Sequence, residues 1–142
     1  MIDIYQKKRL LDEMLERQNK DVTFEQKLLV NDLRRIVKYI EKSIFNIDEC
    51  CIWNGYITNK TSEIKQSYVN FFFKNKKVAL HRLLYSNFIE QIHDNEYIKF
   101  TCENKDIYCC NINHMVKCKY NVQKCKIKKA KNIILTTTIT FD

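Results

Sequence analysis

The stretch FTCENKDIYCCNINH, residues 100–114, decides what kind of fold the chain can adopt. It brings four soft or borderline metal ligands together within fifteen residues: Cys102, Cys109, Cys110 and His114. Thiolate and imidazole groups are the side chains that close a tetrahedral zinc site. The stretch therefore predicts a knuckle held by a metal ion, with the rest of the chain built around it.

The composition fits one metal-stabilised intracellular domain. The 142 residues are 45% hydrophobic, which is enough for a core. Seven is an odd number of cysteines, and the first residues lack the apolar segment of a signal peptide. Both features favour a reducing compartment and metal ligands over disulfides. No apolar run approaches the ~18 residues of a membrane span, so we expect no membrane partner.

Residues 1–46 predict a helical hairpin. Ile4, Leu11, Met14 and Leu15 share one side of an expected helix over residues 3–19. Thr23 and Gln26 form a capping-box pattern that would start a second helix. Apolar residues then recur at helical spacing through about residue 45: Leu29, Leu33, Ile36, Val37, Ile40 and Ile44. The hairpin either packs on the remaining chain or binds a partner, which would be another protein or a second copy of the chain.

Residues 47–142 predict the metal-binding domain. Trp53 and Gly55, the single Trp and single Gly of the chain, indicate a tight turn beside a core anchor. Strands are expected at 68–73 and 78–80 around a turn at 75–77, followed by a helix over 81–88 and a strand over 97–100. A basic helix over 117–131 and a strand over 133–141 would end the chain.

Three motifs in order carry a resemblance to a known family: Cys50-x-x-Trp53-x-Gly55, His81-Arg82, and Cys102 followed by Cys109-x-Asn111-x-x-His114. Over about residues 48–126 the chain resembles the zinc-containing HNH, ββα-metal or His-Me finger, endonucleases. The resemblance implies an α+β fold, with the helical hairpin followed by a zinc-stabilised ββα-metal domain, a basic helix and a terminal strand.

The resemblance also implies a ligand set for a structural Zn²⁺: Cys50, Cys102, Cys109 and His114, with Cys110 as the alternative to Cys109. Cys118 and Cys125 either bind a second ion together with Cys51 or Cys110, or are free thiols.

The catalytic positions depart from the family pattern. The family's general base precedes the first knuckle cysteine by two residues, and Phe100 stands there. A phenyl ring accepts no proton, so we expect a degenerate active site without nuclease activity. In this respect the chain is similar to the Smad DNA-binding domain. An active enzyme would need Mg²⁺ and His81 as a relocated base, with Arg82, Asn121 and Gln123. Otherwise His81 is a structural, hydrogen-bonded histidine and Arg82 pairs with an acidic side chain.

The uneven charge predicts a polyanionic partner, with nucleic acid ahead of an anionic membrane surface, and the family resemblance implies DNA rather than RNA. Residues 117–142 contain seven lysines and Asp142 as their one acid, so they hold +6 of the net charge of +8. The candidate phosphate contacts are Lys74, Lys76, Lys77, Arg82, Lys117, Lys119, Lys124, Lys126, Lys128, Lys129 and Lys131. The alternative is a structural or adaptor subunit of a larger protein or ribonucleoprotein assembly. His93 is expected to be a solvated loop residue.

Overall fold

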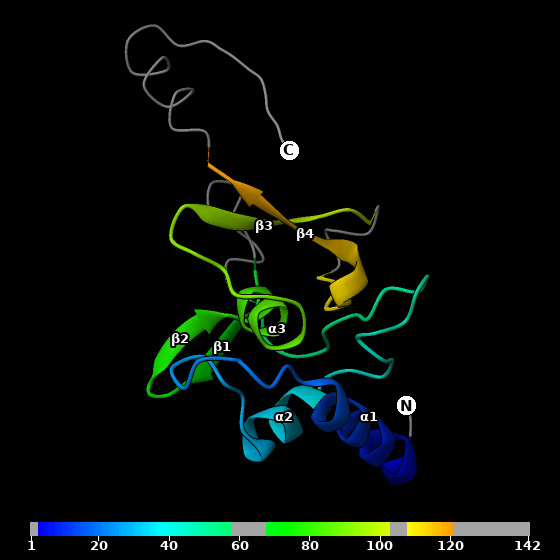
Figure 1. Cartoon of the computed structure of the whole chain (residues 1–142). Coiled ribbons are helices and arrows are strands. Elements are labelled where there is room, and N and C mark those ends of the chain that lie inside the picture. Colours follow the sequence, from blue (N-terminus) through cyan, green and yellow to red (C-terminus); the bar gives the residue numbers. More distant parts are fainter. Residues whose placement is uncertain (1–2, 58–67, 103–107, 121–142) are drawn as a thin grey trace, which may run out of the picture.

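A computed structural model describes residues 3–57, 68–102 and 108–120, and it has an α+β fold (Figure 1). In chain order the elements are α1 (Ile4–Arg17), α2 (Val30–Val37), β1 (Asn70–Phe73), β2 (Lys76–Ala79), α3 (Leu80–Phe88), β3 (Glu96–Phe100), a short 3₁₀ helix η2 (Ile112–His114) and β4 (Met115–Lys119). β1 pairs with β2 and β3 pairs with β4, both antiparallel. α3 lies between these two small sheets (Figure 1).

The first helix forms as its sequence predicts. Asp3 and Gln6 make a reciprocal capping box, with Asp3 accepting the Gln6 N–H at 2.9 Å. Met14 is buried, while Ile4 is 77% exposed, so the apolar stripe is shorter than expected. Lys7 donates to three carbonyls at and just beyond the end of α2, those of Val37, Lys38 and Ile40. A cation there is favourable because it bonds orphan carbonyls at the negative end of the helix.

The second helix is much shorter than predicted. It begins at Val30 rather than after Thr23, and it ends at Val37 rather than near residue 45. Thr23 and Gln26 form only a turn, in which Gln26 N–H donates to the Thr23 carbonyl at 3.0 Å. Ile40 and Ile44 are buried as expected, but they reach the core from irregular backbone.

Asn87 of α3 explains why residues 18–29 need not be helical. Its fully buried amide makes four hydrogen bonds. Its Oδ1 accepts from Leu28 N–H and Gln18 Nε2, and its Nδ2 donates to the Gln26 and Leu83 carbonyls. The Asn87 side chain thus supplies hydrogen-bond partners to backbone groups of residues 18–29 that would otherwise be bonded within a helix.

The first sheet is a tight hairpin close to the predicted one. Its turn residues are Lys74 and Asn75, with φ of 50° and 68°, so the turn lies one residue earlier than expected. Positive φ at both central residues is typical of two-residue hairpins, and Asn tolerates it well. Phe71 and Phe73 point to the core and Phe72 points outward. α3 follows directly, as predicted.

The predicted basic helix over 117–131 is wrong for its first part. Residues Met115–Lys119 form β4, which pairs with β3 so that Phe100 lies opposite Met115 and Tyr97 opposite Cys118. Val116, Cys118 and Tyr120 alternate with lysines, a pattern that suits a strand, and β3 offers an edge to pair with. The remainder of the predicted helix and the predicted terminal strand lie outside the described residues.

One hydrophobic core joins both parts of the chain. It includes Met14 and Leu33 from α1 and α2, Leu84 from α3, and Ile98 and Met115 from the second sheet. The predicted boundary between residues 46 and 47 stays a prediction, but the two sides pack together. In the part of the chain that is described, no helix combines the length and apolar character needed to cross a bilayer.

Candidate metal centre

Residues 50–53 and 108–110 pair side by side, and the pairing places neighbouring cysteines on opposite faces. Ile52 lies opposite Cys109, and this antiparallel contact is fixed by Trp53 N–H donating to the Tyr108 carbonyl at 3.1 Å. Cys110 N–H donates to the Cys51 carbonyl at 2.6 Å. Because neighbouring side chains on a strand point to opposite faces, Cys51 and Cys110 enter the core while their neighbours face the other way.

The second sheet supplies the other two candidate ligands. Cys102 follows the end of β3, and His114 immediately precedes β4. The pairing continues one step beyond the strands, since Thr101 N–H donates to the His114 carbonyl at 2.8 Å. Sheet pairing therefore places Cys102 beside His114, although twelve positions separate them in the sequence.

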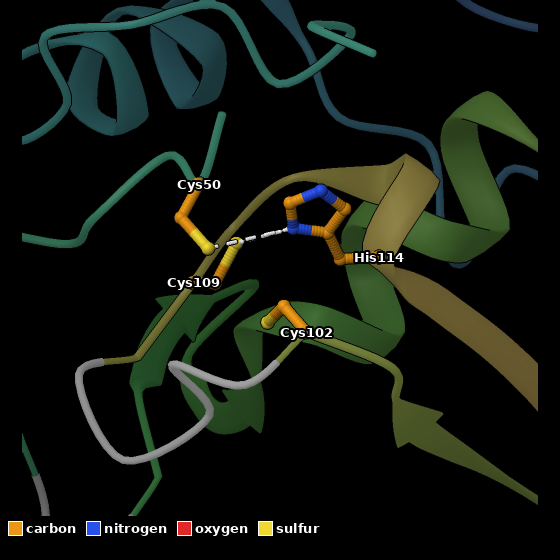
Figure 2. Close-up of side chains that lie close together, drawn as sticks. All are labelled: Cys50, Cys102, Cys109 and His114. Carbon is orange, nitrogen blue, oxygen red and sulfur yellow. Dashed lines mark hydrogen bonds between the residues drawn. The ribbon is translucent and has the colours of Figure 1, made fainter. Parts of the chain in front are cut away.

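Four side chains converge at this point: Cys50, Cys102, Cys109 and His114 (Figure 2). Their ligand atoms all lie within 4.8 Å of one another. The Sγ atoms of Cys50 and Cys109 lie 3.5 Å and 3.4 Å from His114 Nδ1. Standard bond lengths of about 2.3 Å to sulfur and about 2.0 Å to nitrogen give a tetrahedron with S–N edges of about 3.5 Å and S–S edges of about 3.8 Å.

The contacts at His114 Nδ1 favour a shared cation over hydrogen bonding. A ring nitrogen has one proton or one lone pair, so it bonds one sulfur well and not two. Both short distances agree with the edges of a metal tetrahedron. The residues present thus form a Cys₃His group compatible with a bound metal ion, and among the described residues it is the one such group.

Burial shapes the chemistry of these thiols. It raises the pKa of Cys109 to about 12, although the Asn111 backbone N–H, which donates to Cys109 Sγ at 3.3 Å, acts in the opposite direction. A buried thiolate at this position is favourable only beside a positive charge. Metal binding would provide that charge and release the proton.

Asn111 belongs to the motif quoted from the sequence, but its positioning role was not predicted. Its buried Nδ2 donates at 2.7 Å to the carbonyls of Asn46 and Glu49, so it fixes the loop that delivers Cys50. Its backbone N–H contacts Cys109 Sγ, and ligand-orienting bonds of this kind tune a metal site. Asparagine two residues after a ligand cysteine was the available signal, since a short amide can bond neighbouring backbone.

Phe100, which occupies the position of the family's general base, packs against His81. The Phe100 ring packs edge to face on His81, with centroids 5.4 Å apart. Burial, with a smaller effect of Arg82, lowers the pKa of His81 to about 4. Among the described residues no hydrogen bond to the imidazole of His81 is found, so the predicted structural hydrogen bond is not seen there. Asn121 and Gln123 lie outside the described residues.

Several predicted phosphate contacts are instead engaged within the protein. Lys74 donates to the Phe24 carbonyl and lies 3.9 Å from the centre of that ring. The Nζ atom of Lys117 lies 3.4 Å from Glu90 Oε2 and 3.5 Å from Glu96 Oε2. Arg82 donates to the Glu96 carbonyl at 3.2 Å rather than pairing with a carboxylate.

The remaining candidates divide into exposed residues and residues that are not described. Lys76, Lys77, Lys119 and His93 are exposed. Cys118 is half-buried on β4 and does not belong to the Cys₃His group. Cys125 and the predicted contacts Lys124, Lys126, Lys128, Lys129 and Lys131 lie outside the described residues.

Comparison with known proteins gives one relative. No protein-family model matches the chain, and no solved structure matches it. The chain is similar to the uncharacterized protein R328 of Acanthamoeba polyphaga mimivirus, with 55% identity over 120 residues. The aligned region covers 84% of this chain and 35% of that protein, so the chain spans about a third of the relative's length.

Proposed function

We propose that the chain is a zinc-stabilised nucleic-acid-binding protein, related to the HNH nucleases in fold and without their activity. The observation that carries this proposal is the convergence of Cys50, Cys102, Cys109 and His114 beside a phenyl ring where those nucleases have their base.

The donor set favours zinc in a structural role. Three thiolates and one imidazole are soft to borderline ligands, which suit Zn²⁺ and not Mg²⁺ or Ca²⁺. Four protein ligands complete a tetrahedron and leave no open position for water or substrate. The ion would supply folding energy by joining the Cys50 loop to both strands of the second sheet.

The neighbourhood of Phe100 supports the absence of nuclease activity. The family's base must accept a proton near neutral pH, and its loss typically lowers the rate by about 10²–10⁴-fold. His81, in contact with Phe100, has a pKa near 4 and is therefore a weak base.

The charge supports a polyanionic partner. The net charge is +8, and Lys76 and Lys77 are exposed beside the turn of the β1–β2 hairpin. Lys74 and Lys117 are held by protein groups, so they contribute less than their number suggests. Contacts to phosphate give affinity that falls steeply with salt but carry no sequence information.

Two assays test the proposal. Plasmid DNA incubated with Mg²⁺ or Mn²⁺ should remain intact, and the Phe100→His variant shows whether restoring the base restores cleavage. Binding to a labelled duplex should weaken linearly in log–log coordinates as salt rises. Lys76→Ala with Lys77→Ala should reduce that slope by about 0.9 per lost contact, while Lys20→Ala, an exposed control, should not.

The second candidate function is a working endonuclease, favoured by the imidazole of His81 without a hydrogen-bond partner among the described residues. Cleavage by the wild-type chain that disappears in His81→Ala would establish it. Absence of any salt-dependent nucleic-acid binding would instead favour an adaptor subunit.

A further inference from the structure

The β3–β4 hairpin has two faces of different character. Opposite residues of an antiparallel pair share a face, so the register places Ile98 and Lys117 on one side and Tyr97 and Cys118 on the other. The inner side contributes Ile98 and Met115 to the core. The outer side carries Lys99 and Val116, of which Lys99 is exposed and Val116 is 44% exposed.

A pair of tyrosines stands on the outer side. Tyr120 N–H donates to the Asn95 carbonyl at 2.8 Å, which extends the pairing and puts the Tyr120 side chain diagonally next to Tyr97. The two ring centroids are 4.9 Å apart with planes tilted by 37°. Tyr97 is half-buried, whereas Tyr120 is 55% exposed. The ring of Tyr97 therefore orients the ring of Tyr120, and Tyr120 is the ring that is exposed to solvent.

A positive charge lies on the same face of the hairpin as these rings. Lys99 is exposed on the same face as the rings, whereas Lys119, which lies opposite Glu96 in the register, belongs to the inner side. The sequence after Tyr120 adds five more lysines before Asp142, the next acidic residue. Lys117 belongs to the inner side, where Glu90 and Glu96 already neutralise it. The acidic partners thus lie on the inner side, and among the described residues of the hairpin Lys99 gives the outer side its positive charge.

We propose that the outer face of the β3–β4 hairpin binds single-stranded nucleic acid by stacking an unpaired base on Tyr120, with Tyr97 supporting that ring. This inference rests on the proposed function and specifies it further, since it names unpaired strands as the ligand and a surface other than the β1–β2 turn. Aromatic rings on a basic surface recognise single strands because every base has a π-face, while a duplex keeps its bases stacked inside.

Fluorescence anisotropy with labelled strands separates stacking from charge. The ligands are oligothymidylate, oligouridylate, an abasic strand of the same length, and a duplex. The wild-type chain should bind the two base-carrying strands more tightly than the abasic one. Tyr120→Ala should weaken that binding by between about 5-fold and about 150-fold, the range for one stacked base, and should leave binding to the abasic strand unchanged. Preference between the thymidylate and uridylate strands distinguishes DNA from RNA as the source.

Matched variants keep the experiment decisive. Tyr120→Phe retains the ring and should retain affinity, whereas Tyr5→Ala removes a tyrosine of α1 that is more exposed than Tyr120 and should have no effect. Bound zinc and circular dichroism confirm that each variant is folded. Equal binding of the abasic and base-carrying strands, or equal affinities of Tyr120→Ala and wild type, overturns the stacking inference. So does a dimer that Tyr120→Ala dissociates, because the face would then be a protein interface. If no ligand binds, the proposed function itself fails.

Discussion

The two neighbouring cysteines Cys109 and Cys110 offer a sharp test of the metal centre, because the structure gives them opposite roles. Cys109 Sγ faces His114 Nδ1 at 3.4 Å, while Cys110 is only 3% exposed and belongs to the hydrophobic core. We expect Cys109→Ala to abolish zinc binding and Cys110→Ala to preserve it.

The magnitudes follow from the two environments. A structural zinc typically contributes about 10–16 kcal/mol of apparent binding energy. This is comparable to the whole net stability of about 5–15 kcal/mol that domains usually have, so a chain without its zinc should lose the fold around Cys50 and His114. Cys110→Ala removes a single buried sulfur, at a cost of about 1–2 kcal/mol including the small cavity. That cost lowers the melting temperature by about 3–8 °C.

The assay combines metal quantification with thermal unfolding. Wild type and Cys110→Ala should each retain about one zinc per chain after gel filtration, and Cys109→Ala should retain none. Replacing zinc by Co²⁺ gives an absorption spectrum that reports thiolate coordination in a tetrahedral site. If Cys110→Ala loses the metal and Cys109→Ala keeps it, the side-chain alternation described here is wrong. If neither change affects zinc content, the Cys₃His group does not bind the ion.

Three further outcomes are expected. Gly55→Ala should destabilise the chain by about 1–3 kcal/mol and alter the fluorescence of Trp53, because an added Cβ would lie 2.7 Å from Trp53 Nε1; an unchanged melting temperature contradicts this. Asn87→Ala should lower the free energy of unfolding in urea by about 2–5 kcal/mol, because it leaves buried partners such as Leu28 N–H without a hydrogen bond. A decrease below about 1 kcal/mol, the size expected for one exposed hydrogen bond, would speak against that network. The pKa of His81 is lowered to about 4 from an ordinary 6.5, so the unfolded chain takes up a proton first as pH falls. Stability should therefore decrease below pH 6.5, by about 1 kcal/mol at pH 5.5, and His81→Asn should remove this part of the pH dependence; parallel pH profiles for the two chains refute it.

The sequence predicted those features that depend on local pattern. The first helix, the β1–β2 hairpin, α3 and β3 each have an unambiguous period or turn signal, and the structure has them within a few residues. The four ligands converge as the family resemblance implied. The choice of Cys109 over Cys110 was open in the sequence, because it depends on which face of a short segment each residue occupies.

The errors come from long-range contacts that compete with local propensity. The capping-box pattern at Thr23 predicted a helix, but the amide of Asn87, more than sixty residues away, satisfies the Gln26 and Leu28 backbone instead. The lysines after His114 suggested a helix, yet Met115–Lys119 has an open strand edge beside it in β3. The sequence near Thr23 and near Met115 does not indicate that Asn87 or β3 will lie beside it.

Gly55 lies beside the buried Trp53 as predicted, but the reason a glycine is needed there differs from the expected one. A tight turn would use its freedom to adopt positive φ, and Gly55 does not. It is needed because the indole of Trp53 lies directly over its Cα and leaves no room for a side chain. This requirement is steric and depends on a rotamer, which a sequence pattern does not specify.

The doubled cysteines on facing segments have a further consequence for folding. Sliding residues 50–53 by one position against residues 108–110 would present Cys51 where Cys50 now lies, and a thiophilic ion would accept either sulfur. A metal ion bound there would therefore not select the correct alignment by itself. Trp53 can, because it shares the inward face with Cys51, and the misaligned chain would have to expel its largest side chain into water. Burial of Trp53, and not an ion at the Cys₃His group, would therefore select the correct pairing of the two segments.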